Sequence, residues 1–469
     1  MKFTKFGKAL LMGALSAGII VGVTSCVQSY TVGFLYVTGT VTASTGSNGI
    51  ITGYKIDHNT GRLTPINGLP ISSGGANPVR AYLTLGSRFL YVLNRGANAS
   101  GSGNCYGTGA NACLNANVTE YAVGGNGILT PQETFYTQGM NPFRMFTDTS
   151  GNFLFVLDHD APDNVNPTST DNCALALGSL GTSSAKVTTC GDVTVFKIDQ
   201  TTGRLSVVIN AQVTSASGQP ISYFPVPANP VDFVLTGGYI LTLGGGATPT
   251  SYPYVGGTRV FPYNYASTTG QLTLSQSSQQ ALPITQGTAI VNASSVIYVL
   301  DNEPLTITSN PVFNPGTYLS QILPYTVGSG GALQAEPSGV IPDDPNLSNP
   351  IYVMVESKGK YVYVANQGNN VSGPNPESGI SAYFLTTAPA YQLSFIADES
   401  TAITGSGSGP QCIVEDPSNQ FVYEANEYDS TVTGRVLDPN SGDLNPMRVL
   451  STYKLAGQPT WCLVDGRTG

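Results

Sequence analysis

Charge is scarce in this chain of 469 residues: Asp, Glu, Lys and Arg make up 10% of it, with 19 basic against 28 acidic residues. A protein that binds nucleic acid needs a basic face, so this balance excludes nucleic acid as a partner. Histidine occurs only twice and tryptophan once. The sequence also lacks a Gly-rich phosphate loop, zinc-ligand spacing, an EF-hand loop and a Gly-x-Ser-x-Gly motif. These absences leave few routes to metal or phosphate chemistry.

The N-terminus carries the one long apolar run of the chain. Lys2, Lys5 and Lys8 precede apolar and small residues over 9–23, and the run ends at Val23-Thr24-Ser25-Cys26. A basic segment, a short apolar segment and small residues before a cleavage point are typical of a secretory signal. The cysteine makes this segment resemble the bacterial lipoprotein signal, in which Cys26 is lipidated and becomes the mature N-terminus.

We therefore expect a signal peptide over 1–25, a short lipidated linker over 26–32, and attachment to a membrane through acyl chains on Cys26. The protein is then extracytoplasmic, on the bacterial cell envelope. Val27 stands where some lipoproteins carry the Asp that retains them at the inner membrane, which favours the outer membrane or a periplasm-facing position. The alternative is a plain signal peptide in which Cys26 is incidental.

Six further cysteines follow Cys26, and an even number in an exported protein suggests disulfides. Each of two pairs lies within one expected loop and is a candidate to close it: Cys105 with Cys113, and Cys173 with Cys190. A third candidate pair, Cys412 and Cys462, lies on corresponding strands of neighbouring repeats. These two stand second and third after their prolines, which places them on opposite faces of their strands. The pairing stays open from the sequence alone.

One pattern recurs seven times along the chain. It begins with a strand of the form aromatic-aliphatic-Tyr-Val, and its copies stand at 34–37, 89–92, 153–156, 239–242, 296–299, 361–364 and 421–424. A second strand and a hairpin follow. Six of the seven hairpins keep a glycine, which supplies the positive φ of a tight turn. Those glycines are Gly61, Gly127, Gly203, Gly270, Gly331 and Gly442.

A short strand led by proline precedes each next copy. The prolines are Pro78, Pro142, Pro230, Pro350, Pro410 and Pro459, and Gln286-Gly287 takes their place in the remaining copy. Proline fits the first residue of a strand, where no ladder donor is lost. Pro459 begins such a strand at the C-terminus, whereas the first aromatic-led strand has none before it. We therefore expect the C-terminal strand to pair beside 34–38 and to complete the first unit.

A repeat of short strands cannot bury its own apolar faces, so it must stack against its neighbours in a ring. The sequence thus predicts an all-β, seven-bladed β-propeller with four-stranded blades. It occupies 33–469 as a single domain, and the C-terminal strand closes the ring by pairing in the first blade.

The Tyr-Val strands, the Asp-x-x-x-Gly-x-Leu hairpins and the Pro-led strands closely resemble those of YVTN-repeat propellers and the bacterial lactonase family over roughly 30–469. That family includes a 6-phosphogluconolactonase and fungal muconate-lactonising enzymes, all seven-bladed. The resemblance implies a lactonase-like fold. It also implies that an enzyme on this fold would be a lactonase, a carboxylic ester hydrolase, or a cycloisomerase. A fold does not carry its function with it, so the site must decide.

Strand direction sorts the loops onto two faces. On the face that we call upper, the aromatic-led strands end and the Pro-led strands begin. The hairpins and the short turns before the aromatic-led strands form the lower face. Almost all of the long segments fall on the upper face: 96–117, 161–191, 244–258, 304–318 and 367–379. Long loops gathered on one face are typical of a binding surface, while for any single loop a tolerated insertion is the alternative.

Polar residues gather at the expected upper mouth of the central tunnel. They either end the aromatic-led strands or stand second after the proline of the Pro-led strands. The predicted ligand-binding residues are Arg80, Arg95, Asp160, Asp232, Asp301, Glu303, Asn366, Asn426, Glu427 and Trp461. Arginines beside several acids fit a small anionic or sugar ligand held by charge-assisted hydrogen bonds. The alternative is that these groups pair with one another around a wet channel.

Lactone opening or closure needs a proton carrier and a donor for the oxyanion. His58 falls in a lower hairpin, so His159, flanked by Asp158 and Asp160, is the candidate imidazole acid or base. Arg144 is a candidate oxyanion donor, as are Arg80 and Arg95. The resembled enzymes carry His-containing motifs on their inner strands, whereas here those places read Asn-Pro-Val-Arg and Asn-Pro-Phe-Arg. Whether the chain is an enzyme is therefore left open.

No cofactor and no metal are expected, with one alternative. Asp158, Asp160, Asp163, Asn164 and Asp171 lie close in sequence and carry the oxygen ligands that suit Ca²⁺. Asp and Asn also crowd ordinary turns, so this grouping does not by itself predict an ion.

The sequence is consistent with three functions. The first is a monomeric, non-catalytic binding propeller whose upper face holds a small anion, a glycan or a protein partner. The second is a lactone hydrolase or cycloisomerase acting on sugar lactones, with His159 as proton carrier. The third is a structural envelope protein that holds no small ligand.

Overall fold

The computed structural model of the protein describes residues 30–43, 46–99, 105, 112–162, 173, 177, 190–215, 217–244, 258–275, 280–283, 287–293, 296–304, 318–368, 378–386, 392–400, 408–448 and 450–466. The expected signal peptide, Cys26 and most residues of the five long upper segments lie outside these ranges.

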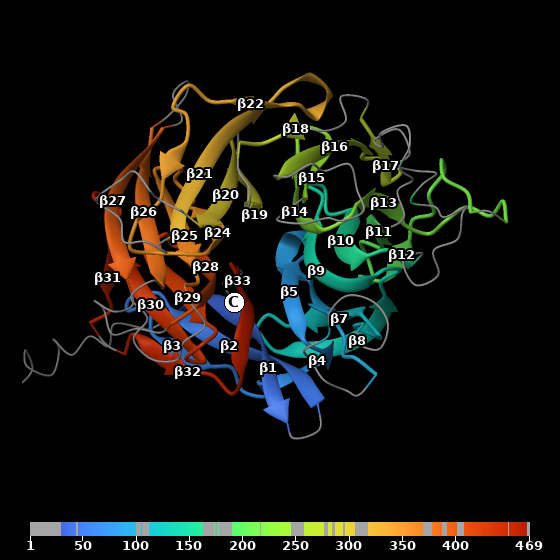
Figure 1. Ribbon diagram of the computed structural model, residues 1–469. Coiled ribbons are helices and arrows are strands. Elements are labelled where there is room, and N and C mark those ends of the chain that lie inside the picture. The colour runs from blue at the N-terminus through green and yellow to red at the C-terminus, as the bar shows by residue number, and fades with distance from the viewer. Residues whose placement is uncertain are drawn as a thin grey trace, which may run out of the picture.

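Seven antiparallel sheets stand around a common centre, as Figure 1 shows. In six of them the chain runs from the innermost strand outward through consecutive strands. In the first sheet the innermost strand comes from the C-terminal end of the chain. The sequence prediction of an all-β, seven-bladed propeller with four-stranded blades is confirmed.

From its inner strand outward, blade 1 contains β33 (Gln458–Asp465), β1 (Thr31–Ala43), β2 (Gly46–Asp57) and β3 (Leu63–Pro65), and β4 (Ile71–Ala76) also pairs with β2. In the same order, blade 2 contains β5 (Pro78–Leu83), β6 (Phe89–Asn94), β7 (Asn117–Val123) and β8 (Leu129–Tyr136). Blade 3 contains β9 (Met140–Thr147), β10 (Phe153–Asp160), β11 (Cys190–Ile198) and β12 (Leu205–Val207), with β13 (Phe224–Pro227) beside β11.

Blade 4 contains β14 (Pro230–Thr236), β15 (Tyr239–Gly244), β16 (Arg259–Ala266) and β17 (Gln271–Leu274), with β18 (Gln280–Ala281) beside β16. Blade 5 contains β19 (Gly287–Ala293), β20 (Val296–Pro304), β21 (Tyr318–Val327) and β22 (Leu333–Ala335), with β23 (Ile341–Pro342) beside β21. Blade 6 contains β24 (Pro350–Val355), β25 (Tyr361–Asn366), β26 (Gly379–Leu385) and β27 (Leu393–Ser400). Blade 7 contains β28 (Pro410–Glu415), β29 (Phe421–Asn426), β30 (Thr431–Leu437) and β31 (Leu444–Pro446), with β32 (Thr452–Lys454) beside β30.

The helical elements whose bounds fall within the described residues are two 3₁₀ turns, η1 (Leu85–Ser87) and η5 (Ser329–Gly331). Within the described ranges, no helix has the length and apolar character needed to cross a membrane.

The two ends of the chain meet in blade 1. Strand β33 lies antiparallel to β1, with Phe34 opposite Asp465 and Thr38 opposite Trp461. The Thr38 hydroxyl also lies 3.1 Å from the hydroxyl of Thr460. The expected closure, in which the C-terminal strand completes the first blade, is confirmed, and the inner edge of that sheet is thereby paired.

A disulfide between Cys412 and Cys462 spans the seam between blades 7 and 1, with a Cα–Cα distance of 5.9 Å. The sequence placed the two side chains on opposite faces of their strands. That placement favours the bridge, because each blade packs one face against the opposite face of the next. In the shared core, blade 7 contributes Tyr423 and Ala425, whereas blade 1 contributes Leu35 and Val37, which occupy alternate strand positions. The other two expected bridges, Cys105–Cys113 and Cys173–Cys190, are also present.

A repeated contact joins each blade to the next. The first aromatic residue of one blade lies over the hairpin glycine of the following blade, where a side chain would have no room. A Cβ atom added at Gly61 would lie 2.4 Å from Cδ1 of Phe421, and one added at Gly442 would lie 2.5 Å from Cδ1 of Tyr361. These glycines also have positive φ, +67° at Gly61 and +83° at Gly442. The corresponding pairs at other junctions are Phe34–Gly127, Phe89–Gly203, Phe153–Gly270 and Tyr239–Gly331.

A tyrosine hydroxyl strengthens four of these contacts. The Tyr at the third position of the aromatic-led strand donates to the carbonyl oxygen of the same glycine. The distances are 2.8 Å for Tyr36 to Gly127, 2.8 Å for Tyr363 to Gly442 and 2.7 Å for Tyr423 to Gly61. Tyr91 donates to Gly203 in the same way. The recurrent Tyr of the sequence pattern is thus explained by a bond between blades.

One junction, from blade 5 to blade 6, lacks this contact. The leading residue there is Val296 in place of an aromatic, and the following hairpin, which precedes Leu393, has no glycine. The hydroxyl of Tyr298 is buried and has no hydrogen-bond partner among the described residues. The aromatic residue and the glycine are lost together, which supports the conclusion that they form one contact.

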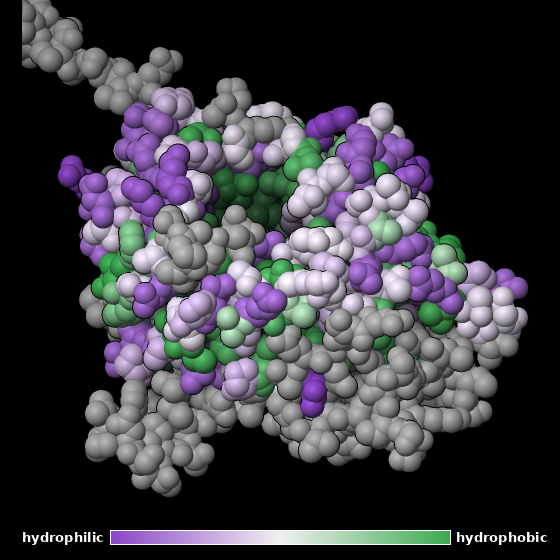
Figure 2. Space-filling model, turned by 90° about the horizontal axis from the view of Figure 1, so that it is seen from above, coloured by the Kyte–Doolittle hydropathy of each residue, from purple (hydrophilic) through white to green (hydrophobic). Residues whose placement is uncertain are grey.

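The outer surface is mixed in character. Figure 2 views the molecule at 90° to Figure 1. On the side that it shows, hydrophilic residues are spread widely and hydrophobic residues line one hollow. Exposed large apolar residues come from different blades, for example Leu85, Tyr136, Phe395 and Leu450. Scattered residues of this kind are normal on a folded protein.

Replacing Tyr423 with Phe is expected to lower the free energy of unfolding by about 1–3 kcal/mol, because the Gly61 carbonyl is left buried without its donor. Tyr298→Phe is the matched control. It removes a hydroxyl without a partner among the described residues and is expected to change that free energy by less than about 0.5 kcal/mol. Denaturant unfolding of the three proteins measures both effects. Equal losses in the two variants would contradict the role given to the bond between blades.

Candidate functional site

The inner strands share a local irregularity that shapes the tunnel. In all seven, the ladder to the neighbouring strand shifts register just after the proline, or after Gly287 in blade 5, as between Pro78 and Arg80 or between Pro350 and Tyr352. A β-bulge of this kind re-aims the side chain that follows it. The residue second after the proline therefore takes an equivalent place in every blade.

Five of these residues line one cavity of about 320 Å³. We call them the tunnel layer: Arg80 of β5, Arg144 of β9, Asp232 of β14, Tyr352 of β24 and Trp461 of β33. Ala289 and Cys412 occupy the equivalent places in blades 5 and 7. Ring closure thus brings together side chains that are far apart in sequence.

The cavity extends from this layer toward the lower face. The rest of its lining comes from Ile351 and from residues that follow the layer along the inner strands: Ala81, Tyr82, Met145, Phe146, Thr147, Phe233, Val234, Leu235, Ile290, Val291 and Asn292. Thr149, in the turn between β9 and β10, also lines it. That turn lies on the lower face, so the cavity points away from the long loops.

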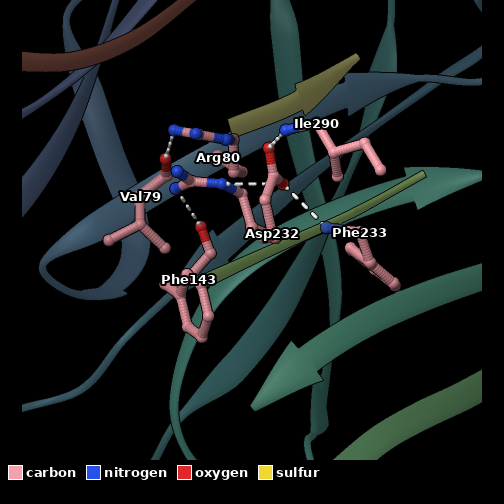
Figure 3. A network of polar contacts seen from close by, with 7 residues as sticks. Val79, Arg80, Phe143, Asp232, Phe233 and Ile290 are labelled. Atoms are coloured by element: carbon pink, nitrogen blue, oxygen red, sulfur yellow. Dashed lines mark hydrogen bonds and ion pairs between the residues drawn. The ribbon is translucent and has the colours of Figure 1, made fainter. Parts of the chain in front are cut away.

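Asp232 is the most fully paired member of the tunnel layer. Its Oδ1 accepts from Nε of Arg144 at 3.0 Å and from the amide of Phe233 at 2.9 Å, and its Oδ2 accepts from the amide of Ile290 at 3.0 Å. Figure 3 shows these bonds converging on Asp232 from three blades. The side chains of Arg144 and Asp232 are 20% and 11% exposed, so the ion pair is largely shielded from water. The Arg144 charge is therefore compensated within the protein.

Arg80 lacks such compensation. Its NH1 group donates to the carbonyl oxygen of Val79 at 3.0 Å, and its Cζ lies 3.9 Å from the centre of the Trp461 ring. No carboxylate of the described residues lies within ion-pair distance of it. Burial, and then the charge of Arg144, place the pKa of Arg80 well below its usual value. The layer thus holds one partly buried cation that lacks an anionic partner among the described residues.

Two aromatic residues complete the layer. The rings of Tyr352 and Trp461 meet edge to face, with centroids 5.0 Å apart and an interplanar angle of 87°. Burial raises the pKa of Tyr352, so its hydroxyl is protonated near neutral pH. One wall of the cavity is therefore aromatic and neutral.

A second polar group lies on the upper face, at the end of β10. Nδ1 of His159 is 3.1 Å from Oδ2 of Asp160, which also accepts from the side-chain amide of Asn141. The His159 side chain is 39% exposed. Burial lowers the pKa of Arg95, while the charge of Asp160 acts in the opposite direction. The ring of Phe143 lies between this group and the tunnel layer, 6.4 Å from the His159 ring and 5.4 Å from Cζ of Arg144.

Other residues predicted at the upper mouth are buried or hydrogen-bonded to side chains of their own or a neighbouring blade. Asn366 donates to the Ser381 hydroxyl at 2.8 Å, and Asn426 donates to the Thr433 hydroxyl at 3.1 Å, both from fully buried positions. Asp301 is also fully buried. The Glu303 side chain lies outside the part that the structure describes. Glu427 accepts from Gln367 at 2.9 Å and from Gln411, and burial raises its pKa.

Asp158 is buried in blade 3 beside Asp192. The Thr194 hydroxyl lies 3.0 Å from Oδ2 of Asp158 and 3.4 Å from Oδ2 of Asp192. Burial raises the pKa of Asp158 to about 8, and burial together with the Asp158 charge raises the pKa of Asp192. Both residues are fully shielded from solvent, so neither contacts the tunnel cavity.

No group of three or more Asp, Glu, His or Cys side chains suited to a metal ion occurs in the described ranges. Asp163, Asn164 and Asp171 of the alternative Ca²⁺ grouping lie outside those ranges.

Comparison with known proteins supports the fold. No family model and no curated protein matches the sequence. Among solved structures, the periplasmic gluconolactonase of Pseudomonas aeruginosa is 17% identical, with a TM-score of 0.61 over 92% of this chain and 99% of that one. Proteins assigned as 6-phosphogluconolactonases from Bacteroides fragilis and Bacteroides uniformis are 14% and 13% identical, with TM-scores of 0.60 and 0.58. Each match covers 92% of this chain, with 98% and 99% of those chains. Identities this low show a shared lactonase-like propeller fold and nothing finer.

The sequence missed the lower lining of the cavity. Phe146, Phe233 and Val291 read as ordinary core residues, because alternation on an inner strand does not separate the side that packs on a neighbour from the side that faces the tunnel. Tyr352 was recognisable, since it stands second after Pro350 as the other members of the layer stand after theirs.

The raised pKa of Asp158 predicts that stability falls as pH rises. An unfolded Asp loses its proton near pH 4, whereas the folded residue keeps it until about pH 8. The contribution of Asp158 to the free energy of unfolding is therefore fully present below about pH 4. Between about pH 4 and pH 8 that free energy falls by up to about 1.4 kcal/mol per pH unit. Asp158→Asn, which cannot ionise, is expected to unfold with a weaker dependence on pH from 5 to 8. Asp199→Asn is the control, because hydrogen bonds from backbone amides lower the pKa of this exposed residue. Parallel pH profiles for wild type and Asp158→Asn, measured by denaturant unfolding, would contradict the assignment.

Proposed function

We propose that this protein is a lipid-anchored, extracytoplasmic binding protein that holds a small anionic ligand in its central tunnel. The signal pattern ending at Cys26 supports the anchor and the compartment. The three disulfides support an oxidising compartment. The neighbouring gluconolactonase of Pseudomonas aeruginosa is a periplasmic protein, which agrees with this placement.

One observation carries the proposal of an anionic ligand. Arg80 lies at a cavity wall with no carboxylate of the described residues paired to it, and Arg144 beside it is paired with Asp232. A partly buried cation without a counter-ion has lost some of its hydration without compensation, and an anion entering the cavity supplies that compensation. The cavity volume of about 320 Å³ is at the lower end of the range for small-molecule sites. A guanidinium at the wall offers paired N–H donors that match a carboxylate.

Trp461, the single tryptophan of the chain, provides the test. Its indole stacks on Arg80, so an anion bound to Arg80 is expected to change its fluorescence saturably. Arg80→Gln is expected to weaken anion binding measured by calorimetry at least tenfold, since a charge-assisted bond contributes about 1.5–3 kcal/mol. Arg204→Gln, on an exposed arginine paired with Glu133, is the control and should bind as wild type does. A flat fluorescence titration with every anion would reject the proposal and favour a structural envelope role.

Lactone hydrolysis or cycloisomerisation is the second candidate, supported by the upper-face group. Asp160 orients the ring of a partly exposed His159, the arrangement that a general acid or base requires. Arg95 lies near enough for its charge to interact with Asp160 and supplies a donor for an oxyanion. Sugar lactones are the substrate class to try first, because three solved neighbours carry that activity in their names.

This candidate predicts turnover of a sugar lactone that falls by about 100-fold or more in His159→Ala, the size expected for loss of a general acid or base. His58→Ala is the matched control, because His58 stacks on Tyr30 at a lower hairpin and should leave turnover unchanged. Release of acid from the lactone is followed in a weakly buffered assay. Absent turnover, or turnover that survives His159→Ala, rejects the candidate.

A further inference from the structure

We infer that the tunnel cavity selects a monocarboxylate with an apolar body, such as an aromatic or short aliphatic acid, over a sugar acid or a phosphate. This inference rests on the proposed anion site at Arg80 and deepens it. Three properties of the cavity lead to it: its charge, the chemistry of its walls, and the places of its few polar side chains.

The charge of the cavity fits one negative charge. Both oxygens of Asp232 are already engaged, by Arg144 and by the amides of Phe233 and Ile290 (Figure 3). Arg144 and Asp232 cancel, so Arg80 is left as the single surplus cation of the layer. A monoanion neutralises it. The dianionic form of phosphate would leave one negative charge in the cavity without a partner, which is unfavourable away from water.

The walls beyond the arginines are apolar. Phe146, Phe233, Ile290 and Val291 come from three different blades and offer no side-chain hydrogen bond to a ligand. Burial of apolar surface stabilises a complex by roughly 25 cal/mol per Å². Each sugar hydroxyl buried here without a partner would instead cost about 1–3 kcal/mol. The walls thus favour a hydrocarbon body over a polyhydroxylated one.

The polar side chains of the lining, apart from the tunnel layer, lie toward the lower opening. Tyr82, Thr147 and Asn292 stand at or next to the last residues of their strands, and Thr149 is in a lower turn. The Asn292 side chain already donates to the carbonyl oxygen of Leu235 at 2.9 Å. Thr147, Thr149 and Asn292 therefore lie farther along the tunnel than the layer, whereas Tyr82 stands only two residues after Arg80 on β5. A ligand with its carboxylate at Arg80 places its body against the apolar walls.

Trp461 and Tyr352 favour a planar body. Their edge-to-face arrangement places an aromatic wall next to Arg80, and one face of the indole is already covered by the guanidinium. A ring that extends from a carboxylate bound to Arg80 meets these aromatic side chains. Aromatic pairs contribute beyond the area that they bury, so an aryl carboxylate is expected to bind more tightly than an alkyl carboxylate of equal size.

Calorimetric titration of the full-length protein with benzoate, hexanoate, gluconate and inorganic phosphate tests the inference. Benzoate and hexanoate are expected to bind at least tenfold more tightly than gluconate and phosphate. Val291→Thr replaces a methyl group of the apolar wall with a hydroxyl of similar size, and it should weaken benzoate binding several-fold. Val340→Thr, at an exposed position, is the matched control and should not. Thermal unfolding of each variant confirms that it is folded.

The outcomes separate this inference from the proposed function. If gluconate or phosphate binds as tightly as benzoate, and Arg80→Gln abolishes that binding, the anion site stands and the inference of an apolar body is overturned. If none of the four anions binds, or if Arg80→Gln binds benzoate as wild type does, both fail. The inference is also overturned if Val340→Thr weakens benzoate binding as much as Val291→Thr does.

Discussion

Six of the seven junctions between neighbouring blades depend on one contact, in which an aromatic ring lies over a glycine of the next hairpin. The glycine has positive φ and no side chain, so the ring reaches the backbone, and in four junctions a tyrosine hydroxyl then reaches the glycine carbonyl. The ring and the glycine belong to two neighbouring blades, so a single blade cannot form this contact. The same contact occurs at the seam between blades 7 and 1, where Phe421 and Tyr423 lie on Gly61. The seam is further held by the Cys412–Cys462 disulfide and by the pairing of β33 with β1.

Closure of the ring also builds the candidate site. Trp461 belongs to the last strand of the chain and Arg80 to blade 2, yet they stack at 3.9 Å because β33 completes blade 1. The bulge near the start of each inner strand then brings equivalent residues of several blades into one layer. The fold and the site therefore share a cause: the same terminal strand that stabilises the ring supplies one wall of the cavity.

Most of the fold was predictable because its signals repeat. The Tyr-Val strands, the hairpin glycines and the terminal Pro459 give the blade number and the closure directly. The site was less predictable, because strand position does not tell which way a polar residue points. Arg80, Arg144, Asp232 and Trp461 were expected near one another and are. Asn366, Asn426 and Asp158 carry the same kind of strand-end signal, but they are buried within their blades. The apolar lower lining gave no signal apart from that of core residues.

Iodide offers the most direct measurement of the central claim that Arg80 binds an anion in the tunnel. Crystals of the protein soaked in iodide would be examined by anomalous difference density. The account predicts a peak within hydrogen-bonding distance of the Arg80 guanidinium on its cavity side, in a position shielded from bulk water. Iodide peaks confined to the outer surface, with the Arg80 guanidinium bonded instead to a carboxylate of the protein, would contradict it.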